Sequence, residues 1–345
     1  MSIYRLSPES DGRWASLVAS HPRSSVFHTL PWLEALRKTY GHAAVVFTLC
    51  PPDRELTNGI LFAEVNSWLT GVRLVSMPYS DHCDPLVSSE AELSRLLNGI
   101  GGTLGSRIRY AEVRPRSGIV GDQSDFEPQA QFLLHVIDLQ PPVGDIYSLL
   151  HRDSVRRKIR RAGRENVGIV EGRSESLLRE FYELLLLTRR RHRLPPQPFK
   201  WFRNLADCFG ERLTVRVARL GGRPIASMIT IGHKKTLVFK YGCSDARVHN
   251  VGAVPALFWT AIRDAKQLGF LEFDLGRSEL ANKGLIVFKE HLGAKAEPIG
   301  YWRTRSAWPN RAEAILMSLA GRDIISHVPD RLLRWGGKVF YRHSG

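Results

Sequence analysis

A row of arginines is the first feature of this 345-residue chain whose residue type and spacing could do chemistry. Arg156, Arg160 and Arg164 recur at i, i+4 and i+8 within residues 153–164, which puts their guanidinium groups on one side of a predicted helix. Like charges at this spacing destabilise an isolated helix, so a sequence tolerates them more readily beside an anion. We therefore predict that Arg156 and Arg160 bind a phosphate-bearing ligand, the alternative being a solvated helix surface.

A second basic cluster, Arg-Arg-Arg-His-Arg over residues 189–193, ends the long predicted helix 174–192. Cations at the carboxyl end of a helix are stabilised by the helix macrodipole, but five in a row exceed that need. We predict that Arg190 and His192 join the first cluster in one basic wall that binds the same ligand.

The net charge of +15 is concentrated in the middle of the chain. Residues 151–220 hold 18 basic and 8 acidic side chains, whereas residues 1–150 hold 12 and 16. This distribution implies a phosphate-bearing partner: a transfer RNA, a cofactor of the coenzyme A type, a pyrophosphate-linked lipid or an anionic membrane surface. The composition, 43% apolar and 24% charged, is otherwise that of a globular protein of about two domains.

The elements that must position a ligand follow one another between residues 236 and 303. The sequence pattern predicts, in order, a strand 236–241, a helix 253–268, a strand 270–275, a helix 284–292 and a strand 297–303. A polar loop and a Gly-Arg-Ser turn connect them, and ligands collect outside the carboxyl ends of such strands. The candidate binding residues on these connections are Asp245, His249, Gly252, Arg277 and Asn282. Asn282 is also expected to cap the helix that follows it.

Other kinds of chemistry find no support in the residue spacing. No Ser/His/Asp or Cys/His constellation is recognisable, so we expect no covalent catalysis. Asp81-His82-Cys83-Asp84 has metal-ligand residue types without a second cluster, so we expect no metal ion and no tightly bound cofactor. The four cysteines are scattered without a CxxC motif and are expected to stay reduced, as in the cytoplasm.

The order of strands and helices predicts an α/β (α+β) chain with two tandem domains, each a mixed, mostly antiparallel sheet flanked by helices. The first domain is expected over residues 1–140 and the second, which carries the motifs above, over residues 141–305. A basic helical tail, residues 306–345, could cap the fold or lie on a membrane surface.

Four motifs of the second domain, taken together, resemble one known family. Tyr-Gly-Cys-Ser-Asp at 241–245, Phe-Asp-Leu-Gly-Arg-Ser at 273–278, the eleven residues 284–294 with their Phe-Lys pair, and Tyr-Trp at 301–302 follow in fixed order. Their spacing is similar to that of the Fem family of peptidoglycan-bridge aminoacyltransferases and of its relatives in the GNAT acetyltransferase superfamily. The resemblance implies two GNAT-like domains and the transfer of an acyl group to an amine.

The resemblance also implies roles for single residues. Phe288 and Lys289 match the Phe-Lys pair that lies at the transfer site of Fem-type enzymes, with Tyr241 a weaker catalytic candidate. We predict that Phe288 points into the core and turns Lys289 toward the groove, where its amine stabilises the oxyanion of acyl transfer. The alternative is an exposed helix lysine without a chemical role. The residues expected to face the acceptor from the first domain are Tyr79, Ser80 and Asp81.

Residues 249–254 indicate which acyl donor the protein uses. By the resemblance, they correspond to the loop that holds the pyrophosphate of acetyl-CoA in GNAT enzymes. The sequence keeps Gly252, but Val254 replaces a small residue of that loop, and its branched side chain would crowd a phosphate. Aminoacyl-tRNA is therefore the expected donor, with acyl-CoA or acyl carrier protein as the alternative.

Three functions stay open at this point. The first is transfer of an acyl or aminoacyl group onto an amine of a cell-envelope precursor, which is lipid-linked in one version. The second is an acetyl-CoA- or acyl-carrier-dependent N-acetyltransferase of exopolysaccharide or envelope biosynthesis. The third is a non-catalytic relative that binds nucleic acid or membrane. We expect a cytoplasmic monomer, with peripheral contact to the inner face of the membrane through the basic tail.

Overall fold

The computed structural model describes residues 2–67, 71–104, 107–116, 125–304, 336–337 and 340–342. The chain divides into two compact units that are interleaved along the sequence. Unit 1 comprises Met1–Phe132, Pro298–Leu319 and Lys338–Gly345, and unit 2 comprises Leu133–Glu297 and Ala320–Gly337. The sequence instead predicts consecutive domains. The predicted helical tail, residues 306–345, lies outside the described residues except for 336–337 and 340–342.

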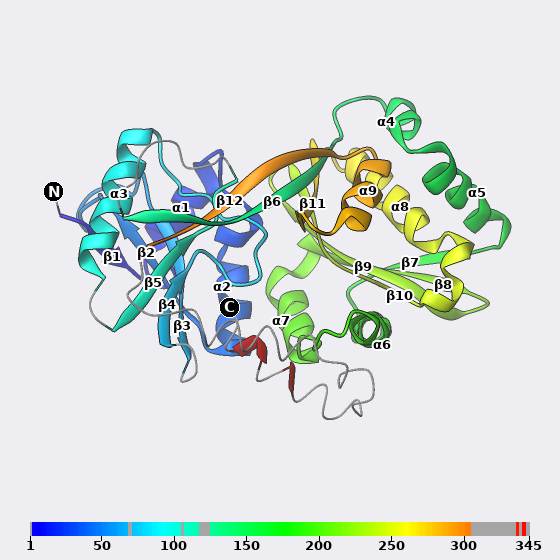
Figure 1. Ribbon diagram of the computed structural model, residues 1–345, viewed down its shortest axis with the longest axis horizontal. Coiled ribbons are helices and arrows are strands. Elements are labelled where there is room, and N and C mark those ends of the chain that lie inside the picture. The colour runs from blue at the N-terminus through cyan, green and yellow to red at the C-terminus, as the bar shows by residue number, and fades with distance from the viewer. Residues whose placement is uncertain are drawn as a thin grey trace. The chain divides into compact units, whose positions relative to one another are not determined.

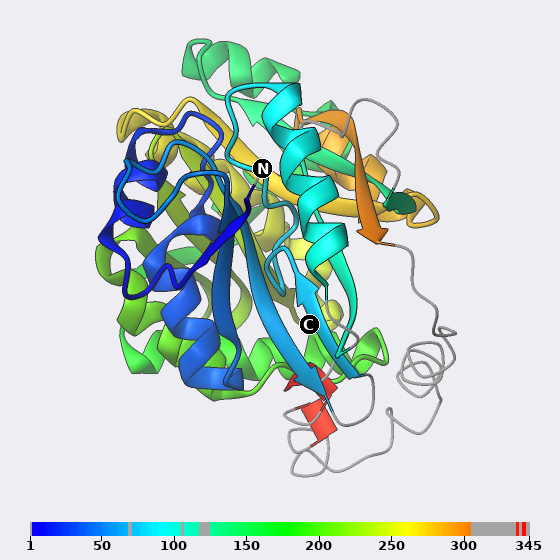
Figure 2. The ribbon, with the colours of Figure 1, turned by 90° about the vertical axis from the view of Figure 1, so that its left-hand side faces the viewer.

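Unit 1 is a sheet with the strand order β1-β2-β3-β4-β5-β12. Its elements are β1 (Tyr4–Leu6), α1 (Gly12–Ser20), η1 (Val26–His28), α2 (Leu30–Tyr40), β2 (Ala43–Thr48), β3 (Ile60–Ser67), β4 (Gly71–Val75), α3 (Glu90–Thr103) and β5 (Ile108–Val113). The strands are antiparallel except for β4 and β5, which are parallel and joined through α3. Helix α3 lies along this sheet (Figure 2) and buries Leu93, Leu96, Leu97 and Ile100 in its core.

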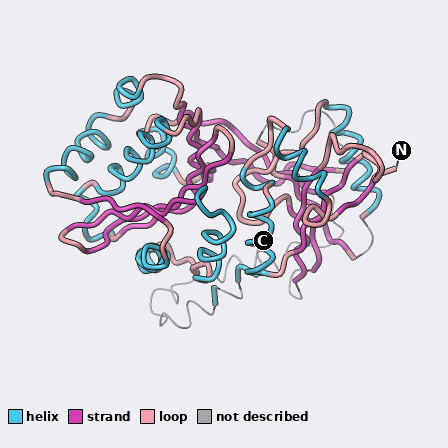
Figure 3. Tube along the Cα trace, turned by 180° about the vertical axis from the view of Figure 1, so that it is seen from behind, coloured by secondary structure: helices cyan, strands magenta, loops and turns pink. Residues whose placement is uncertain are grey.

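Unit 2 carries the remaining described elements, except that β6 and β12 run between the units, and Phe126–Phe132 and Pro298–Thr304 belong to unit 1. They are β6 (Phe126–Asp138), α4 (Val143–Leu149), the π-helical turn η2 (Arg152–Arg156), α5 (Arg157–Arg164), β7 (Gly168–Gly172), α6 (Glu175–Arg191), α7 (Phe199–Phe209), η3 (Gly210–Arg212), β8 (Leu213–Leu220), β9 (Arg223–His233), β10 (Thr236–Ser244), η4 (Ala246–Val251), α8 (Ala253–Gln267), β11 (Glu272–Glu279), α9 (Lys283–His291) and β12 (Lys295–Thr304). The strand order is β6-β11-β10-β9-β8-β7. Helices α6 and α7 cover one face of this sheet and α4, α5, α8 and α9 lie on the other side (Figures 1 and 3).

Strands β10 and β11 of unit 2 are paired over only the first half of their length. Strands β7 to β10 form an antiparallel meander. After the crossover helix α8, β11 pairs with β10 in parallel through Thr236–Val238 and Glu272–Asp274. Strand β10 then continues to Ser244 and β11 to Glu279, with a register irregularity between Phe239 and Tyr241 of β10. The sheet therefore opens between these two strands toward their carboxyl ends.

Both units share this plan, because each contains one parallel pair joined by a helix: β4 and β5 in unit 1, β10 and β11 in unit 2. Each unit completes its sheet with a strand that begins in the chain segment of the other. Strand β12 pairs with β5, and β6 neighbours β11. The predicted fold class, two GNAT-like domains with mixed, mostly antiparallel sheets, is confirmed.

One predicted turn is wrong. Gly276, Arg277 and Ser278 belong to strand β11 instead of forming a turn after it. The neighbouring strand β6 explains this, because its His135 lies 3.4 Å from the Ser278 hydroxyl through Nδ1. A strand that begins more than a hundred residues earlier thus extends β11, and local sequence cannot reveal such a partner.

Candidate functional site

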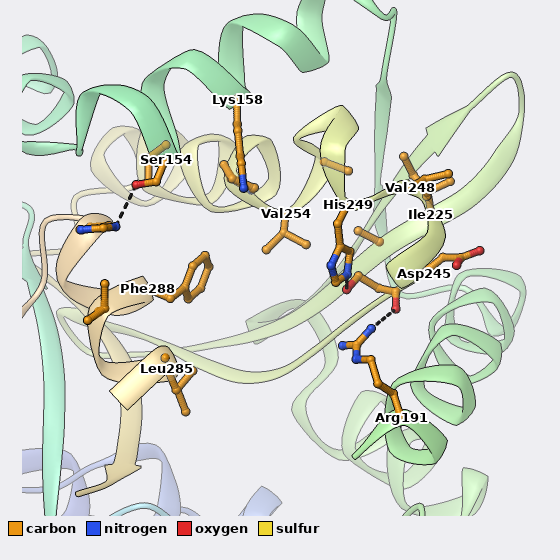
Figure 4. Close-up of a pocket in the computed structure, with 18 of the residues that line it drawn as sticks. Ser154, Lys158, Arg191, Ile225, Asp245, Val248, His249, Val254, Leu285 and Phe288 are labelled. Atoms are coloured by element: carbon orange, nitrogen blue, oxygen red, sulfur yellow. Dashed lines mark hydrogen bonds between the residues drawn. The ribbon is translucent and has the colours of Figure 1, made fainter. Parts of the chain in front are cut away.

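A cavity of about 920 Å³ lies in unit 2, above the carboxyl ends of β10 and β11. Side chains of η2, the loop around η4, the start of α8 and one face of α9 line it (Figure 4). The polar lining residues are Ser154, Lys158, Arg191, His192, Ser244, Asp245, His249, Asn282 and His291. Val254 and Phe288 contribute apolar surface.

A smaller cavity of about 240 Å³ fills the opening between the parting strands. Phe239, Gly242 and Cys243 of β10 line it on one side and Leu275 of β11 on the other. Ser244, Leu285 and Phe288 line both cavities, so the two spaces share a wall.

Lys289 lies at this opening and is 4% exposed. Its Nζ donates hydrogen bonds to the carbonyl oxygens of Gly276 at 2.8 Å and Arg277 at 3.0 Å. These carbonyls belong to the part of β11 beyond its pairing with β10, where a buried carbonyl needs another donor. Lys289 supplies that donor and puts a cation at the parting of the strands.

Helix α9 is rotated differently from the prediction. Leu285, Phe288 and His291 lie one helical turn apart and face the main cavity, while Lys289 and Ile286 are buried. Phe288 packs against Phe258 of α8, with ring centroids 5.7 Å apart, and so forms cavity wall instead of deep core. Lys289 turns toward β11, where the carbonyl oxygens of Gly276 and Arg277 accept hydrogen bonds from its ammonium group.

The loop between β10 and α8 is fixed by Asp245 and Gly252. The Asp245 carboxylate caps η4 and bonds Arg247 at 2.7 Å and Arg223 at 3.1 Å; these contacts, led by the Arg247 hydrogen bond, lower the pKa of Asp245 to about 2. Gly252 has φ +88° and begins α8, and any Cβ there would collide with the Lys158 carbonyl oxygen. Asn282 accepts the Leu285 backbone N–H at 3.1 Å, so the predicted cap of α9 is confirmed.

Two histidines beside Arg191 favour their neutral form. Burial lowers the pKa of His192, and the charges of Arg191 and Arg189 lower it further. Burial likewise lowers the pKa of His249, together with Arg191 and Lys158. The His249 Nε2 lies 2.8 Å from the Ser244 hydroxyl oxygen (Figure 4). This wall of the cavity is therefore electropositive without a charge on either imidazole.

An open basic groove adjoins His249 on the outer side of α5. Its lining residues are Arg157, Lys158, Arg161, Arg164, Glu165, His249 and Asn250. The prediction that Arg156 and Arg160 bind the ligand is not supported, because these two residues line neither the groove nor the cavity. Arg157, Arg161 and Arg164 of the same helix line the groove instead. Val155 and Ala162 turn toward the core, which directs Arg157, Arg161 and Arg164 to the opposite, solvent-facing side.

Other predicted residues lie away from the cavity wall. Tyr241 is 7% exposed, packs against Phe202 and accepts a hydrogen bond from Trp201 Nε1 at 2.7 Å, because the β10 irregularity turns it toward α7. Arg190 and Arg277 are absent from the residues that line either cavity, whereas Arg191 and His192 line the larger one. Arg277 contributes its carbonyl oxygen to Lys289.

The three candidates of the first domain lie together in unit 1. Tyr79 has φ +61° and donates its hydroxyl proton to the Tyr341 carbonyl oxygen. Ser80 donates to the Met77 carbonyl oxygen at 2.8 Å, and the Asp81 carbonyl oxygen accepts the Tyr301 hydroxyl at 2.8 Å. Their part in binding an acceptor stays a prediction.

The sequence reasoning missed three residues at the edge of the cavity: His151, Ser154 and His291. Ser154 Oγ lies 2.8 Å from Nδ1 of each imidazole. His151 and Ser154 have the i, i+3 spacing of a cap, but His291 is 137 residues further on. No local signal joins these residues, so only the fold reveals the cluster.

Two kinds of feature are not found in the described part of the chain. No group of three or more His, Cys, Asp or Glu side chains there could hold a metal ion. None of the helices that the structure describes is long and apolar enough to cross a membrane.

Comparisons with known proteins show which families and structures this chain resembles. A family profile described as an acetyltransferase (GNAT) domain matches residues 150–284. A UDP-N-acetylmuramoylpentapeptide-lysine N(6)-alanyltransferase of Weissella viridescens is 26% identical over 227 residues, which span 63% of this chain and 62% of that protein. The crystal structure of FemX superposes with a TM-score of 0.68 at 12% identity, covering 93% of this chain and all of the other. The L-PGS of Bacillus licheniformis superposes with a TM-score of 0.56 at 15% identity, covering 92% and 98%.

The profile match over residues 150–284 and the parallel pair β10 and β11 first define a GNAT-like domain in unit 2. The sequence match to the alanyltransferase and the fold shared with FemX support the resemblance to the Fem-type family that the motifs predict.

Proposed function

We propose that this protein transfers an aminoacyl group from aminoacyl-tRNA to an amine of a cell-envelope precursor. The observation that carries the proposal is Lys289, a buried cation fixed at the parting of β10 and β11, beneath a cavity large enough for a donor terminus and an amine. Acyl transfer develops negative charge on the carbonyl oxygen, and a pre-organised cation in a site of low dielectric stabilises that charge.

The donor is proposed from the charge and shape of the cavity. Arg191 and Lys158 line it, and the basic groove of α5 continues outward from His249. A transfer RNA could place its backbone phosphates along this groove and its acylated end in the cavity. Val254 points into the cavity at the start of α8 (Figure 4), where a pyrophosphate would otherwise approach the helix amides.

The acceptor is proposed by analogy with the relative from Weissella viridescens, whose name specifies a lysine amine of a UDP-linked muramoyl pentapeptide. A lipid-linked version of such a precursor would bring the protein to the inner face of the membrane. We propose a cytoplasmic location and a monomer.

A second candidate is an acyl-CoA-dependent N-acyltransferase. The start of α8 favours it, because Ala253 and Val254 line the cavity with the first turn of a 15-residue helix, whose free backbone N–H groups suit phosphate. The Val254 side chain at this place is the argument against it.

A donor panel tests the proposal. The purified full chain is incubated with UDP-N-acetylmuramoyl pentapeptide containing lysine and with alanyl-tRNA, acetyl-CoA or acetylated acyl carrier protein. We expect an alanylated product, identified by mass spectrometry, with alanyl-tRNA alone. Product with acetyl-CoA alone would instead establish the second candidate, and no product with any donor would contradict both.

A further inference from the structure

The cluster of His151, Ser154 and His291 joins two elements at the edge of the main cavity. Ser154 Oγ is 2.8 Å from Nδ1 of His151 and 2.8 Å from Nδ1 of His291. The two imidazole rings are stacked, with centroids 4.1 Å apart and an interplanar angle of 16°. The His151 backbone N–H also donates to the His291 carbonyl oxygen at 2.9 Å. Element η2 is thereby tied to the end of α9.

The hydrogen bonds indicate which atom accepts the hydroxyl proton of Ser154. His151 Nδ1 accepts the Ser154 backbone N–H at 3.2 Å, so this nitrogen has a lone pair and no proton. The Ser154 hydroxyl can therefore donate to His151 Nδ1 while its own oxygen accepts a proton from another group. A hydroxyl that can accept on one side and donate on the other is suited to pass a proton.

The placement of the three residues gives this path two ends. Ser154 and His291 line the main cavity, where Phe288 lies one turn before His291 on the same face of α9. His151 is exposed to solvent. A proton taken up at Ser154 could leave the cavity through His151 without crossing the apolar wall.

We propose that Ser154 is the residue that accepts the proton of the acceptor amine, with His151 and His291 as its proton relay. The inference rests on the proposed acyl transfer, since it assigns the base of that reaction. A lysine amine is protonated at neutral pH and has no lone pair for attack until that proton is removed.

The acceptor ammonium loses one proton to Ser154 Oγ as the hydroxyl proton passes to an imidazole nitrogen. The neutral amine attacks the acyl carbon, a C–N bond forms, and the C–O ester bond to the transfer RNA breaks. The second amine proton neutralises the leaving ribose oxygen, and the relay releases its proton to water.

The test compares two acceptors that differ only in basicity. One is the lysine-containing pentapeptide, and the other carries an aminooxy group in place of the lysine amine, which is unprotonated at neutral pH. We expect Ser154→Ala to lower kcat about 100-fold with lysine, with unchanged KM for alanyl-tRNA, and to change kcat little with the aminooxy acceptor. Ser148→Ala, at an exposed serine of α4, is the matched control and should behave as wild type with both acceptors.

A second variant examines the outer end of the path. His151→Ala should lower kcat with the lysine acceptor, and imidazole added to the buffer should restore part of the activity, because an exposed ring can be replaced from solution. Equal loss with both acceptors in Ser154→Ala would overturn the proposal and leave Ser154 a structural residue. Wild-type protein that transfers to neither acceptor would instead contradict the proposed function itself.

Discussion

Charged side chains have different roles in unit 1 and unit 2. In unit 1 the Glu112 side chain is 3% exposed and is held by Arg114 at 2.7 Å and by Arg303. In unit 2 Arg157 and Arg161 of α5 are 72% and 42% exposed, and each meets one carboxylate of its own helical segment, at 3.9 and 3.3 Å. The first group is a closed ion network inside the fold, and the second is an open basic surface.

The comparison shows what burial demands of a charge. A charge removed from water must be compensated where it lies, so the arginines around Glu112 are already committed to structure. Exposed guanidinium groups keep their hydration and interact weakly with neighbouring carboxylates, so their positive field remains available to a ligand. Lys289 is a third arrangement, a buried cation that donates hydrogen bonds to two backbone carbonyl oxygens.

The largest effect is expected in the closed network. Glu112→Ala should lower the free energy of unfolding by about 3–5 kcal/mol, because it leaves two largely buried arginine side chains, 12% and 23% exposed, without their carboxylate. Chemical denaturation of the full chain measures this. The matched control is Glu165→Ala, which removes the partner of Arg161 on α5 and should cost about 0–1 kcal/mol. Equal costs for the two variants would remove the distinction between the regions.

Lys289 tests whether a buried cation can serve chemistry as well as structure. Lys289→Ala should lower kcat for alanyl transfer about 10²–10³-fold, the loss typical of one pre-organised donor at an oxyanion. Its unfolding free energy should also fall by about 1–3 kcal/mol, since buried carbonyl oxygens lose their donor. Lys283→Ala, at the exposed start of the same helix, serves as the control. A destabilised variant with full kcat at low temperature would restrict Lys289 to a structural role.

Substitutions in the open basic surface of α5 should change the affinity for transfer RNA instead of the free energy of unfolding. A variant with Arg157, Arg161 and Arg164 all changed to alanine should bind transfer RNA about tenfold or more weakly, with a salt slope reduced by about 2–3. Fluorescence anisotropy at several salt concentrations measures both quantities. The control changes three other exposed arginines of unit 2: Arg173, Arg203 and Arg212. If both triple variants lose affinity equally, the groove has no special role.

Asp245 is intermediate between the buried network and the open surface, because its carboxylate is buried and its arginine partners are exposed. Its substitution should have the smallest effect on stability. Its side chain is 4% exposed, but its partners Arg223 and Arg247 are 63% and 69% exposed. Because its folded pKa is lowered to about 2 from 3.8, its contribution to stability is present above pH 3.8 and is lost as the pH falls toward 2. Melting temperatures of wild type and Asp245→Asn should therefore differ at pH 5 and converge near pH 2. A difference that persists at pH 2 would contradict the lowered pKa.

The sequence by itself determined the local elements and the family resemblance. Hydrophobic periodicity predicts α8 and α9 nearly to their ends, because helical spacing is a property of neighbouring residues. Asn282 is recognisable as a helix cap for the same reason. The motifs between residues 241 and 302 reveal the resemblance to the Fem-type family, since their order and spacing are linear information.

Only the tertiary structure decided how these elements meet. Periodicity shows that Phe288 and Lys289 point in different directions, but hydrogen bonds to two carbonyl oxygens of β11 decide that Lys289 turns toward the strand. Likewise, β6 decides that Gly276–Ser278 is a strand, and η2 meets α9 to bring Ser154 beside His291. Each of these outcomes depends on contacts between residues far apart in the chain, which packing determines and local sequence does not encode.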